Sequence, residues 1–195
     1  STDELIYAWH PDGFAMHSMR SDKVSRLYLQ VAPKDDIANW SDDRIWTALS
    51  DRMALSGWEL KTGEITEKNI LAMRSFVSGK LQHGRLFLVG DAGHTVPPTG
   101  AKGLNAAVND VRFLGEGLVD FFKKNDSGLL TAYSDRAKET IWRVTHFSWW
   151  MTTMLHTFPD SLAYDQKLQE VDLAYLFSSE AAQSSLAENY VGLPF

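Results

Sequence analysis

The sequence predicts an α+β fold, in which a small antiparallel sheet comes first, a strand-loop-helix unit follows, and helices make up the rest. Three short β-rich runs separated by turn residues open the chain. From about Gly103 the apolar residues recur at helical spacing almost to the end. The 195 residues, 44% hydrophobic and 23% charged, suffice for one full core or two small ones. Disorder is therefore excluded.

The opening runs are expected to form an antiparallel meander. The predicted strands are 5–10, 14–21 and 24–31, and they are separated by Pro11-Asp12-Gly13 and by Asp22-Lys23. Both separators contain residues that favour turns, which places each strand beside the one before it.

A helix over 42–55 should cover one face of that sheet. Ser41 is a suitable N-cap, since its hydroxyl can accept a hydrogen bond from the first turn. The apolar residues of this segment recur at the spacing of an amphipathic helix, at Ile45, Trp46, Leu49 and Met53.

Two further strands are predicted ahead of the helical region. Residues 70–77 are a candidate fourth strand. The run 85–89 is continuous and largely apolar, which is typical of a fully buried strand, and Gly90-Asp91 ends it.

The helical region is predicted to contain four helices. The first starts near Gly103 and ends at Lys123-Lys124-Asn125, where cations and a left-handed residue favour a C-terminus. The second runs over 129–156, and two shorter ones begin near Asp160 and Ser178, whose side chains can cap a first turn. The first helix carries one apolar stripe, made of Leu104, Val108, Val111, Leu114, Leu118 and Phe122.

Charge and composition narrow the possible functions. Nineteen Lys and Arg against twenty-five Asp and Glu give a net charge of -6, so the broad basic field typical of nucleic-acid binding is missing. No run approaches the roughly 18 apolar residues of a membrane span, and with no cysteine a cytoplasmic location is expected. The first residue is Ser and a strand-like pattern begins by Glu4, so we expect a piece of a longer protein.

The strongest local signal is the run GDAGHTVPPTGAKGLN at 90–105. It reads as a strand that delivers the carboxylate of Asp91, a loop whose glycines allow close backbone approach, and a helix N-terminus with free N–H groups. This arrangement suits an anionic or carbonyl-bearing ligand. A plain connection in which Asp91 caps the helix fits the same residues.

The second signal lies on the opening strands. Ser18 and Arg20 are two residues apart, as are Arg26 and Tyr28, so each pair shares a face. An odd-numbered turn would set Ser18 opposite Tyr28 and Arg20 opposite Arg26, and a bound anion would relieve that like-charge contact. Two solvated arginines on an open face are the alternative.

Other candidate sites are weaker. His146 and His156 are ten residues apart on one predicted helix and point to different faces, so no metal is indicated. No serine lies in a GxSxG turn, which leaves Asp91 and His94 without a nucleophile to serve. The seven tryptophans are expected in cores and helix contacts.

The run at 90–105 resembles the second flavin-contacting motif of the FAD-dependent aromatic hydroxylases, the single-component (class A) flavoprotein monooxygenases. The resemblance is strongest with the members that act on 4-hydroxybenzoate, and it covers nearly the whole chain. The strings that carry it are DELIYA at 3–8, RSFV at 74–77, FSWWMT at 147–152 and ENYVGLP at 188–194.

The resemblance is to the C-terminal half of that FAD/NAD(P)-binding fold, because no GxGxxG unit is present. The segment Gly115-Glu116-Gly117 is too short a match and reads as helix surface. The resemblance implies a substrate-binding sheet with one covering helix at 1–80, a returning flavin-binding segment at 81–125, and a C-terminal helical region at 126–195.

The resemblance also implies roles at the substrate. Ser18, Arg20 and Tyr28 match the positions that hold the substrate carboxylate. Tyr7 and Tyr190, each an ordinary tyrosine when taken alone, match a hydrogen-bonded pair that takes the proton from the substrate phenol. The backbone carbonyl of Pro98 accepts from the same network.

At the cofactor, the resemblance implies that Asp91 binds the ribityl chain of FAD and that Arg26 faces the flavin. Lys102 would add positive potential. The backbone N–H groups of the helix start, at Gly103, Leu104 and Asn105, would stabilise negative charge on the flavin. Arg74 matches a position linked to NADPH.

The implied reaction converts 4-hydroxybenzoate to 3,4-dihydroxybenzoate with FAD, NADPH and O2, a step of aromatic hydrocarbon catabolism, in a cytoplasmic homodimer. The N-terminal FAD-binding half would be a required partner, and this chain alone should be inactive. Two alternatives stay open. One is a hydroxylase of a different phenolic acid, since Leu27 stands where a second aromatic residue would be expected, and the other is an inactive fragment or dimerisation module.

Overall fold

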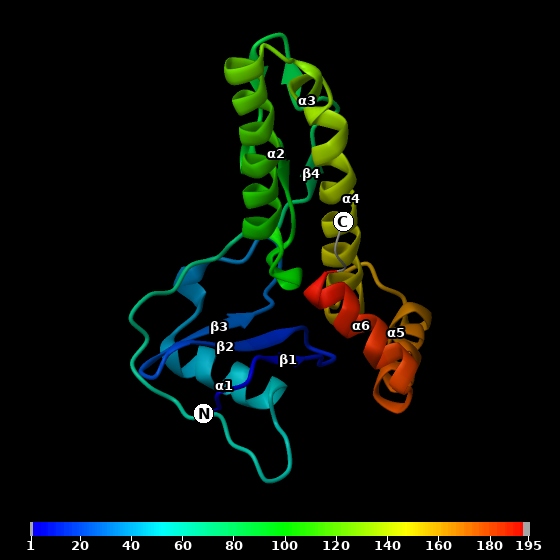
Figure 1. Cartoon of the computed structure of the whole chain (residues 1–195). Coiled ribbons are helices and arrows are strands. Elements are labelled where there is room, and N and C mark those ends of the chain that lie inside the picture. Colours follow the sequence, from blue (N-terminus) through cyan, green and yellow to red (C-terminus); the bar gives the residue numbers. More distant parts are fainter. Residues whose placement is uncertain (1, 193–195) are drawn as a thin grey trace. The chain divides into compact units, whose positions relative to one another are not determined.

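The computed structural model describes residues 2–192, which divide into two units (Figure 1). Within the described residues, unit 1 comprises the chain up to 72 together with 153–179, and unit 2 comprises 73–152 together with 180–192. Each unit draws on two separate stretches of the chain. The predicted α+β class is confirmed, since small antiparallel sheets and helices both occur. The three regions implied by the resemblance stay a prediction.

Unit 1 contains the predicted meander. The strands are β1 (Ile6–Ala8), β2 (Ala15–Ser21) and β3 (Val24–Leu29), in the order β1-β2-β3 with both neighbours antiparallel. A 3-10 turn, η1 (Ile37–Asn39), leads to helix α1 (Asp42–Arg52). Figure 1 shows α1 lying along the sheet.

Helix α1 begins and packs as the sequence predicts. The Ser41 hydroxyl accepts a hydrogen bond from the Arg44 N–H at 3.3 Å, which caps the first turn. The helix covers one face of the sheet through a core of Ala15, Leu49, Met53 and Leu60, against which Ala8, Leu27, Leu29, Ile45, Trp46 and Trp58 pack.

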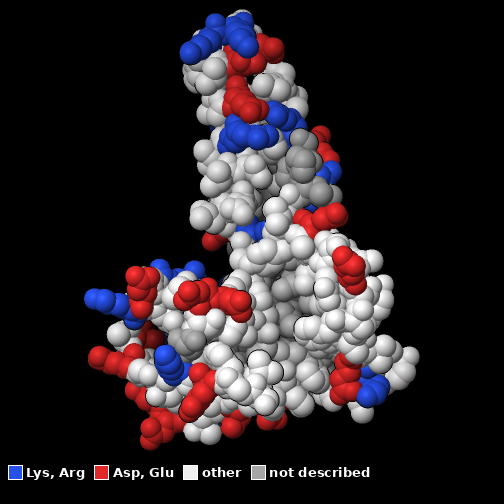
Figure 2. Space-filling model, turned by 60° about the horizontal axis from the view of Figure 1, so that its bottom comes forward, with Lys and Arg blue, Asp and Glu red and all other residues white. Residues whose placement is uncertain are grey.

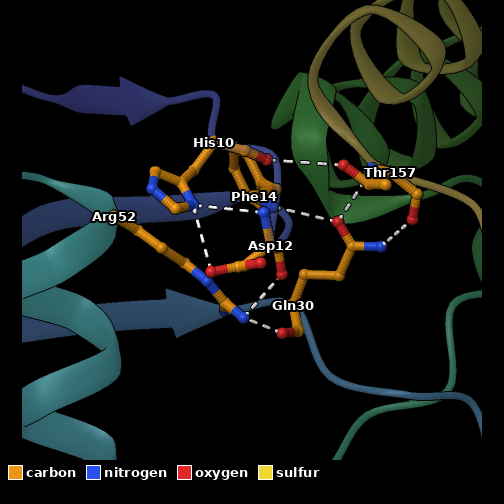
Figure 3. A network of polar contacts seen from close by, with 6 residues as sticks. All are labelled: His10, Asp12, Phe14, Gln30, Arg52 and Thr157. Carbon is orange, nitrogen blue, oxygen red and sulfur yellow. Dashed lines mark hydrogen bonds and ion pairs between the residues drawn. The ribbon is translucent and has the colours of Figure 1, made fainter. Parts of the chain in front are cut away.

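A polar network fixes the turn between β1 and β2 (Figure 3). Arg52, at the end of α1, donates one hydrogen bond to the Asp12 carbonyl at 2.7 Å and another to the Gln30 carbonyl at 2.8 Å. The Gln30 side chain accepts from Phe14 N at 2.9 Å and from Thr157 N at 3.1 Å. Burial lowers the pKa of Arg52. One guanidinium and one amide thus join four segments of unit 1.

Helix α5 (Ala163–Ser178) completes unit 1. The predicted caps are wrong: the Asp165 carboxylate accepts from Leu162 N at 2.9 Å at the helix start, and Ser178 lies in the last turn with its hydroxyl donating to Ala174 and Tyr175 carbonyls. A carboxylate inside the first turn can accept a hydrogen bond from a backbone N–H at the helix start, as the side chain of a residue before the helix can.

Unit 2 opens with two short pairs of antiparallel strands. Strand β4 (Phe76–Val77) pairs with β7 (His94–Thr95), and β5 (Gln82–His83) pairs with β6 (Leu86–Phe87). The predicted strand at 70–77 is therefore limited to its last two residues. The predicted buried strand at 85–89 is limited to Leu86 and Phe87, and Leu86 is 62% exposed. A strand is fully buried only when both of its faces are covered, whereas Phe87, Leu88 and Val89 pack against the core of unit 2 and are only partly buried.

Two 3-10 turns, η2 (Gly90–Ala92) and η3 (Pro98–Gly100), connect these strands to the helices. The helices are α2 (Gly103–Lys124), α3 (Gly128–Thr131), α4 (Tyr133–Leu155), which continues past the unit boundary, and α6 (Glu180–Val191). Asn125 ends α2 with φ 55°, as predicted. The predicted helix at 129–156 is interrupted at Ala132. The core of unit 2 consists of Leu81, Phe113, Tyr133, Ala137 and Ile141.

Helix α2 buries a different face from the one predicted. Its buried residues are Ala106, Asp110, Phe113 and Gly117, whereas most of the predicted stripe is exposed. Gly117 is required here, because a Cβ at this position would lie 2.9 Å from the Leu130 Cδ2 and 3.1 Å from the Leu130 N. None of the described helices is long and apolar enough to cross a membrane.

Candidate functional site

Most residues expected at the substrate share one face of the unit 1 sheet. Tyr7 pairs with Met16, Met16 pairs with Tyr28, and Ser18 pairs with Arg26. Directly paired residues point to the same side, so all five lie on the face opposite α1. The neighbours Ala15, Leu27 and Leu29 point to the α1 side, where they contact its core.

The register differs from the one predicted. Ser18 lies opposite Arg26 and not Tyr28, because the turn at Asp22-Lys23 has two residues and the ladder is irregular between Met19 and Ser21, which leaves Arg20 without a direct partner residue. The pairing of Arg20 with Arg26, which an odd-numbered turn would have given, therefore does not occur.

Both arginines nevertheless meet at Tyr28. Arg20 Nη2 donates to the Tyr28 hydroxyl at 3.5 Å, and the Arg26 guanidinium lies 5.4 Å from the centre of the Tyr28 ring. Both arginines are exposed, whereas Ser18 is buried at 9%. Two guanidinium groups, a phenol and a serine hydroxyl thus line one face, and these are the donors that bind a carboxylate with two hydrogen bonds.

Charge on the rest of the surface is mixed. On the face drawn in Figure 2, Lys and Arg are interspersed with Asp and Glu. Arg20 and Arg26, which both approach Tyr28, supply a local positive charge at the sheet.

The loop at Gly90-Asp91 belongs to unit 2. Gly90 has φ 58°, a conformation that favours glycine, and its N–H donates to an Asp110 carboxylate oxygen at 2.9 Å. Asp91 is exposed at the tip of this turn. Its carboxylate is free to accept hydrogen bonds from a hydroxyl-rich ligand.

The start of α2 follows after η3. A Cβ at Gly100 would lie 2.7 Å from the Ser148 Oγ and 3.1 Å from the Ser148 Cα, so glycine here lets η3 pack directly on α4. Ala101 then takes a left-handed conformation with φ 52°. The Pro98 carbonyl accepts from Ala101 N at 2.9 Å and retains a second lone pair.

This helix start can accept a planar ligand with a negative edge. The first N–H groups of a helix have no intrahelical acceptor, and they carry the positive end of its dipole. A Cβ at Gly103 would meet only the Val96 Cγ2, at 3.8 Å, and Leu104 and Asn105 are both exposed. Together with the exposed carboxylate of Asp91, these N–H groups can bind a planar ligand that has a negative edge and hydroxyl groups.

Lys102 is the buried cation next to this helix start. It is 8% exposed, its Nζ donates to the Tyr190 carbonyl, and it lies 5.4 Å from the ring centres of both Phe147 and Tyr190. Burial lowers the pKa of Lys102. Lys102 therefore ties the helix start to α6. The contact of Phe147 with Lys102 and Tyr190 was not predicted, because no spacing in the sequence relates residues so distant along the chain.

The remaining expected residues are placed within their own units. Tyr7 packs its ring against Phe14 at 6.1 Å in unit 1, whereas Tyr190 packs against Phe147 at 6.0 Å in unit 2. The pairing of the two tyrosines stays a prediction. Arg74 is exposed in a segment of unit 2 without regular structure.

A buried hydrogen bond between two side chains also escaped sequence reasoning. His94 Nε2 lies 2.7 Å from an Asp110 carboxylate oxygen, and the two side chains are 2% and 1% exposed. The signal in the sequence that could have revealed it is Asp110, a carboxylate that shares one helix face with Ala106, Phe113 and Gly117. Among residues 2–192 there is no group of three or more side chains that could hold a metal ion.

A flavin-binding protein is the class that this loop and helix start define. Residues 1–148 match the family described as "FAD binding domain", and the chain belongs to that family. The p-hydroxybenzoate hydroxylase of Acinetobacter baylyi is 45% identical over 194 residues, which are 99% of this chain and 48% of that protein. The chain thus spans about half the length of this curated relative.

Solved structures share the fold. An aromatic hydroxylase from angucycline biosynthesis has a TM-score of 0.66 at 22% identity, over 99% of this chain and 39% of that one. The p-nitrophenol 4-monooxygenase of Pseudomonas putida has 0.67 at 18%, over 93% and 47%. A Diels-Alderase from pyrroindomycin biosynthesis has 0.69 at 20%, over 96% and 40%. Because these relatives differ in reaction, the fold alone does not define the activity.

Proposed function

We propose that the chain is the substrate-binding and flavin-contacting part of an FAD-dependent monooxygenase that hydroxylates 4-hydroxybenzoate to 3,4-dihydroxybenzoate with NADPH and O2. The observation that carries this proposal is the sheet face on which Tyr7, Ser18, Arg26 and Tyr28 lie together, with Arg20 reaching the Tyr28 hydroxyl. The 45% identity to a p-hydroxybenzoate hydroxylase supports it.

The carboxylate of the substrate would bind to this face. A planar guanidinium matches a carboxylate with two parallel hydrogen bonds, and the Ser18 and Tyr28 hydroxyls can donate to its remaining lone pairs. Arg20 is the better candidate for the direct contact, because it already donates to Tyr28. Arg26 would face the flavin.

FAD would be held by Asp91, by the N–H groups of Gly103, Leu104 and Asn105, and by the positive potential of Lys102. When bound, it supplies the electron transfer from NADPH and the activation of O2. The protein's own part is to orient the substrate ring, to exclude water and to accept negative charge at the α2 N-terminus. Arg74 would contact NADPH.

Two tyrosines would move the phenol proton. Ionised phenol is the better nucleophile toward an electrophilic oxygen, so a base that removes this proton raises the rate. The Tyr7 oxygen would accept this proton while its own proton passes to Tyr190, and Tyr190 would release a proton to solvent. The Pro98 carbonyl, which keeps a free lone pair, would accept from the same network.

The structure weakens the case for a different phenolic acid as substrate. That alternative relied on Leu27, but Leu27 points to the α1 side and packs against Ala15 and its neighbours. Met16, which is 7% exposed, is the apolar residue of the sheet on the substrate face. Leu27 is therefore partly buried against the core on the α1 side of the sheet.

A chimaera tests the function. The N-terminal half of the Acinetobacter relative, joined to this chain, should purify yellow with bound FAD and oxidise NADPH faster when 4-hydroxybenzoate is added, with 3,4-dihydroxybenzoate as the product by chromatography. This chain alone should purify colourless. A yellow chimaera that hydroxylates only other phenolic acids would refute the substrate, and a yellow preparation of this chain alone would refute the need for the other half.

We also propose that the complete protein is a cytoplasmic homodimer. A mass measured by light scattering on the chimaera tests the oligomeric state: twice the chain mass is expected.

A further inference from the structure

Helix α2 has two apolar faces, and the described chain covers only one of them. The buried face, formed by Ala106, Asp110, Phe113 and Gly117, packs on the core of unit 2. The other face we call the α2 stripe. It consists of Leu104 (77% exposed), Val108 (58%), Val111 (60%), Leu118 (37%), Val119 (49%) and Phe122 (78%). At about 100° per residue, the centres of the two faces lie about 150° apart.

The α2 stripe contains no charged residue, whereas charged side chains lie on one flank beside it. Arg112 Nε lies 3.7 Å from Glu116, and Lys124 Nζ lies 2.8 Å from Asp120, in pairs one turn apart. These ion pairs are typical of a solvated helix surface. A helix that keeps a solvated flank between two opposite apolar faces is built to be covered on both faces.

Gly115 lies within the α2 stripe by helical spacing. A Cβ at this position would meet nothing within 4 Å, whereas a Cβ at Gly117 would collide with Leu130. Glycine destabilises a helix interior relative to alanine, and the contacts of unit 2 give no reason for it at position 115. An element outside the described chain that approaches α2 closely would supply that reason.

We propose that the α2 stripe is the surface on which the remaining, dinucleotide-binding half of the protein docks, with Gly115 at the point of closest approach. The proposal rests on the proposed function for the identity of the occupant. The relatives of this chain are long enough to contain such a second half, because this chain covers only 48% of the Acinetobacter protein and 39% of the angucycline hydroxylase. Leu104 also begins the stripe in the first turn of α2, so an occupant would sit beside the helix start that fits a flavin.

Single cysteines can test the surface, because the chain contains none. Val111→Cys places a thiol on the α2 stripe, and Val171→Cys is the matched control on α5, with 60% and 56% exposure in the parent residues. In the isolated chain both thiols should react with a maleimide at similar rates. In the chimaera with the Acinetobacter N-terminal half, its own cysteines replaced by serine, the Val111→Cys thiol should react more than about tenfold more slowly, while the Val171→Cys thiol should stay comparatively accessible.

Equal labelling of the two sites in the folded chimaera would overturn the proposal. So would slow, concentration-dependent labelling at position 111 in the isolated chain, because a second copy would then cover the stripe. A chimaera that precipitates also counts against it, since proteins 45% identical should share this contact surface. Labelling needs no turnover, so a chimaera that protects position 111 but does not hydroxylate would contradict only the proposed function.

Gly115 gives an independent measurement. Gly115→Ala in the isolated chain should raise the thermal midpoint by a few degrees, because helix propensity improves and no contact is disturbed. Gly115→Leu in the chimaera should lower FAD retention by more than about tenfold and restore labelling at position 111. A Gly115→Leu chimaera with unchanged FAD retention would show that nothing approaches α2 there, and would refute the close contact.

Discussion

His94 Nε2 and an Asp110 carboxylate oxygen lie 2.7 Å apart in a hydrogen bond that is buried almost completely and that joins the loop after Asp91 to the middle of α2. The same carboxylate oxygen accepts the N–H of Gly90, so one acidic side chain fixes both ends of the loop. Its other oxygen has no hydrogen-bond partner among the described residues. The pair therefore couples the position of Asp91 to α2, the helix whose N-terminus would stabilise negative charge on the flavin.

Removal of one partner should unfold the loop region. Asp110→Ala leaves a buried histidine and a backbone N–H without an acceptor, so the free energy of unfolding should fall by about 3–5 kcal/mol in urea titrations. Asp120→Ala removes the exposed pair with Lys124 and should cost less than about 1 kcal/mol. Equal losses of unfolding free energy in the two variants would show that the buried pair stabilises the fold no more than the pair of Asp120 with Lys124.

Arg52 should be hard to replace, because its two nitrogens donate to the carbonyls of Asp12 and Gln30. Arg52→Lys can restore at most one of these contacts, so it should lower the stability of unit 1 by about 1–3 kcal/mol. Arg112→Lys, on the exposed flank of α2, is the control and should change the urea midpoint little. A stable Arg52→Lys variant would mean that water replaces the guanidinium.

The stability of the chain should fall above pH 10. Tyr133 is fully buried and donates to the Leu88 carbonyl at 2.7 Å. Burial first, and the charge of Asp110 second, raise the pKa of Tyr133 above its ordinary value of 10.0. The unfolded chain therefore loses this proton before the folded chain does, and the stabilisation present below pH 10 is lost as the pH rises further.

Thermal unfolding between pH 8 and pH 11.5 tests this effect. Tyr133→Phe should cost about 1 kcal/mol at pH 8 and should reduce the alkaline loss. Tyr175→Phe, at a residue that is 61% exposed, should leave both unchanged. An alkaline slope that is the same in all three proteins would rule out Tyr133 as its source.

In the chimaera, Arg20→Lys should weaken 4-hydroxybenzoate binding by about ten- to a hundredfold, because an ammonium group cannot form the planar two-bond contact with a carboxylate. A flavin fluorescence titration measures this. Affinity equal to that of the parent chimaera would contradict the carboxylate role of Arg20.

The tyrosine variants separate proton transfer from packing. Tyr7→Phe and Tyr190→Phe in the chimaera keep the rings against Phe14 and Phe147 but remove the hydroxyls, so folding should change little. Product formation should fall by about 10²- to 10⁴-fold while NADPH is still consumed and hydrogen peroxide is released. Hydroxylation with the coupling of the parent would make the tyrosine in question structural.

The elements that the sequence predicted correctly are those set by local chemistry. The meander follows from turn residues, α1 from Ser41 and its apolar spacing, and the end of α2 from Asn125. The pairing of Ser18 with Arg26 could not be predicted, because the irregularity between Met19 and Ser21 leaves no mark in the sequence.

Two wrong predictions of burial share a cause. The run 85–89 and the α2 stripe are apolar, and apolar character was interpreted as burial within this chain. Leu86 and most of the α2 stripe are exposed, and Phe87, Leu88 and Val89 are only partly buried. Hydrophobic patterning reports that a surface needs cover and does not report which segment provides it. Long-range contacts, such as that of Lys102 with Tyr190, have no local signature at all.

The interleaving of the two units limits how the chain can be shortened. It passes from one unit to the other after 72, after 152 and after 179, so no single cut separates them. A truncation after 152 would take from unit 1 the Thr157 backbone that Gln30 binds, and from unit 2 the Tyr190 carbonyl that accepts from Lys102. Unit 1 is complete only when residue 179 has been synthesised, long after the whole first stretch of unit 2, and unit 2 is complete only with α6, so neither unit can be obtained as a continuous subclone.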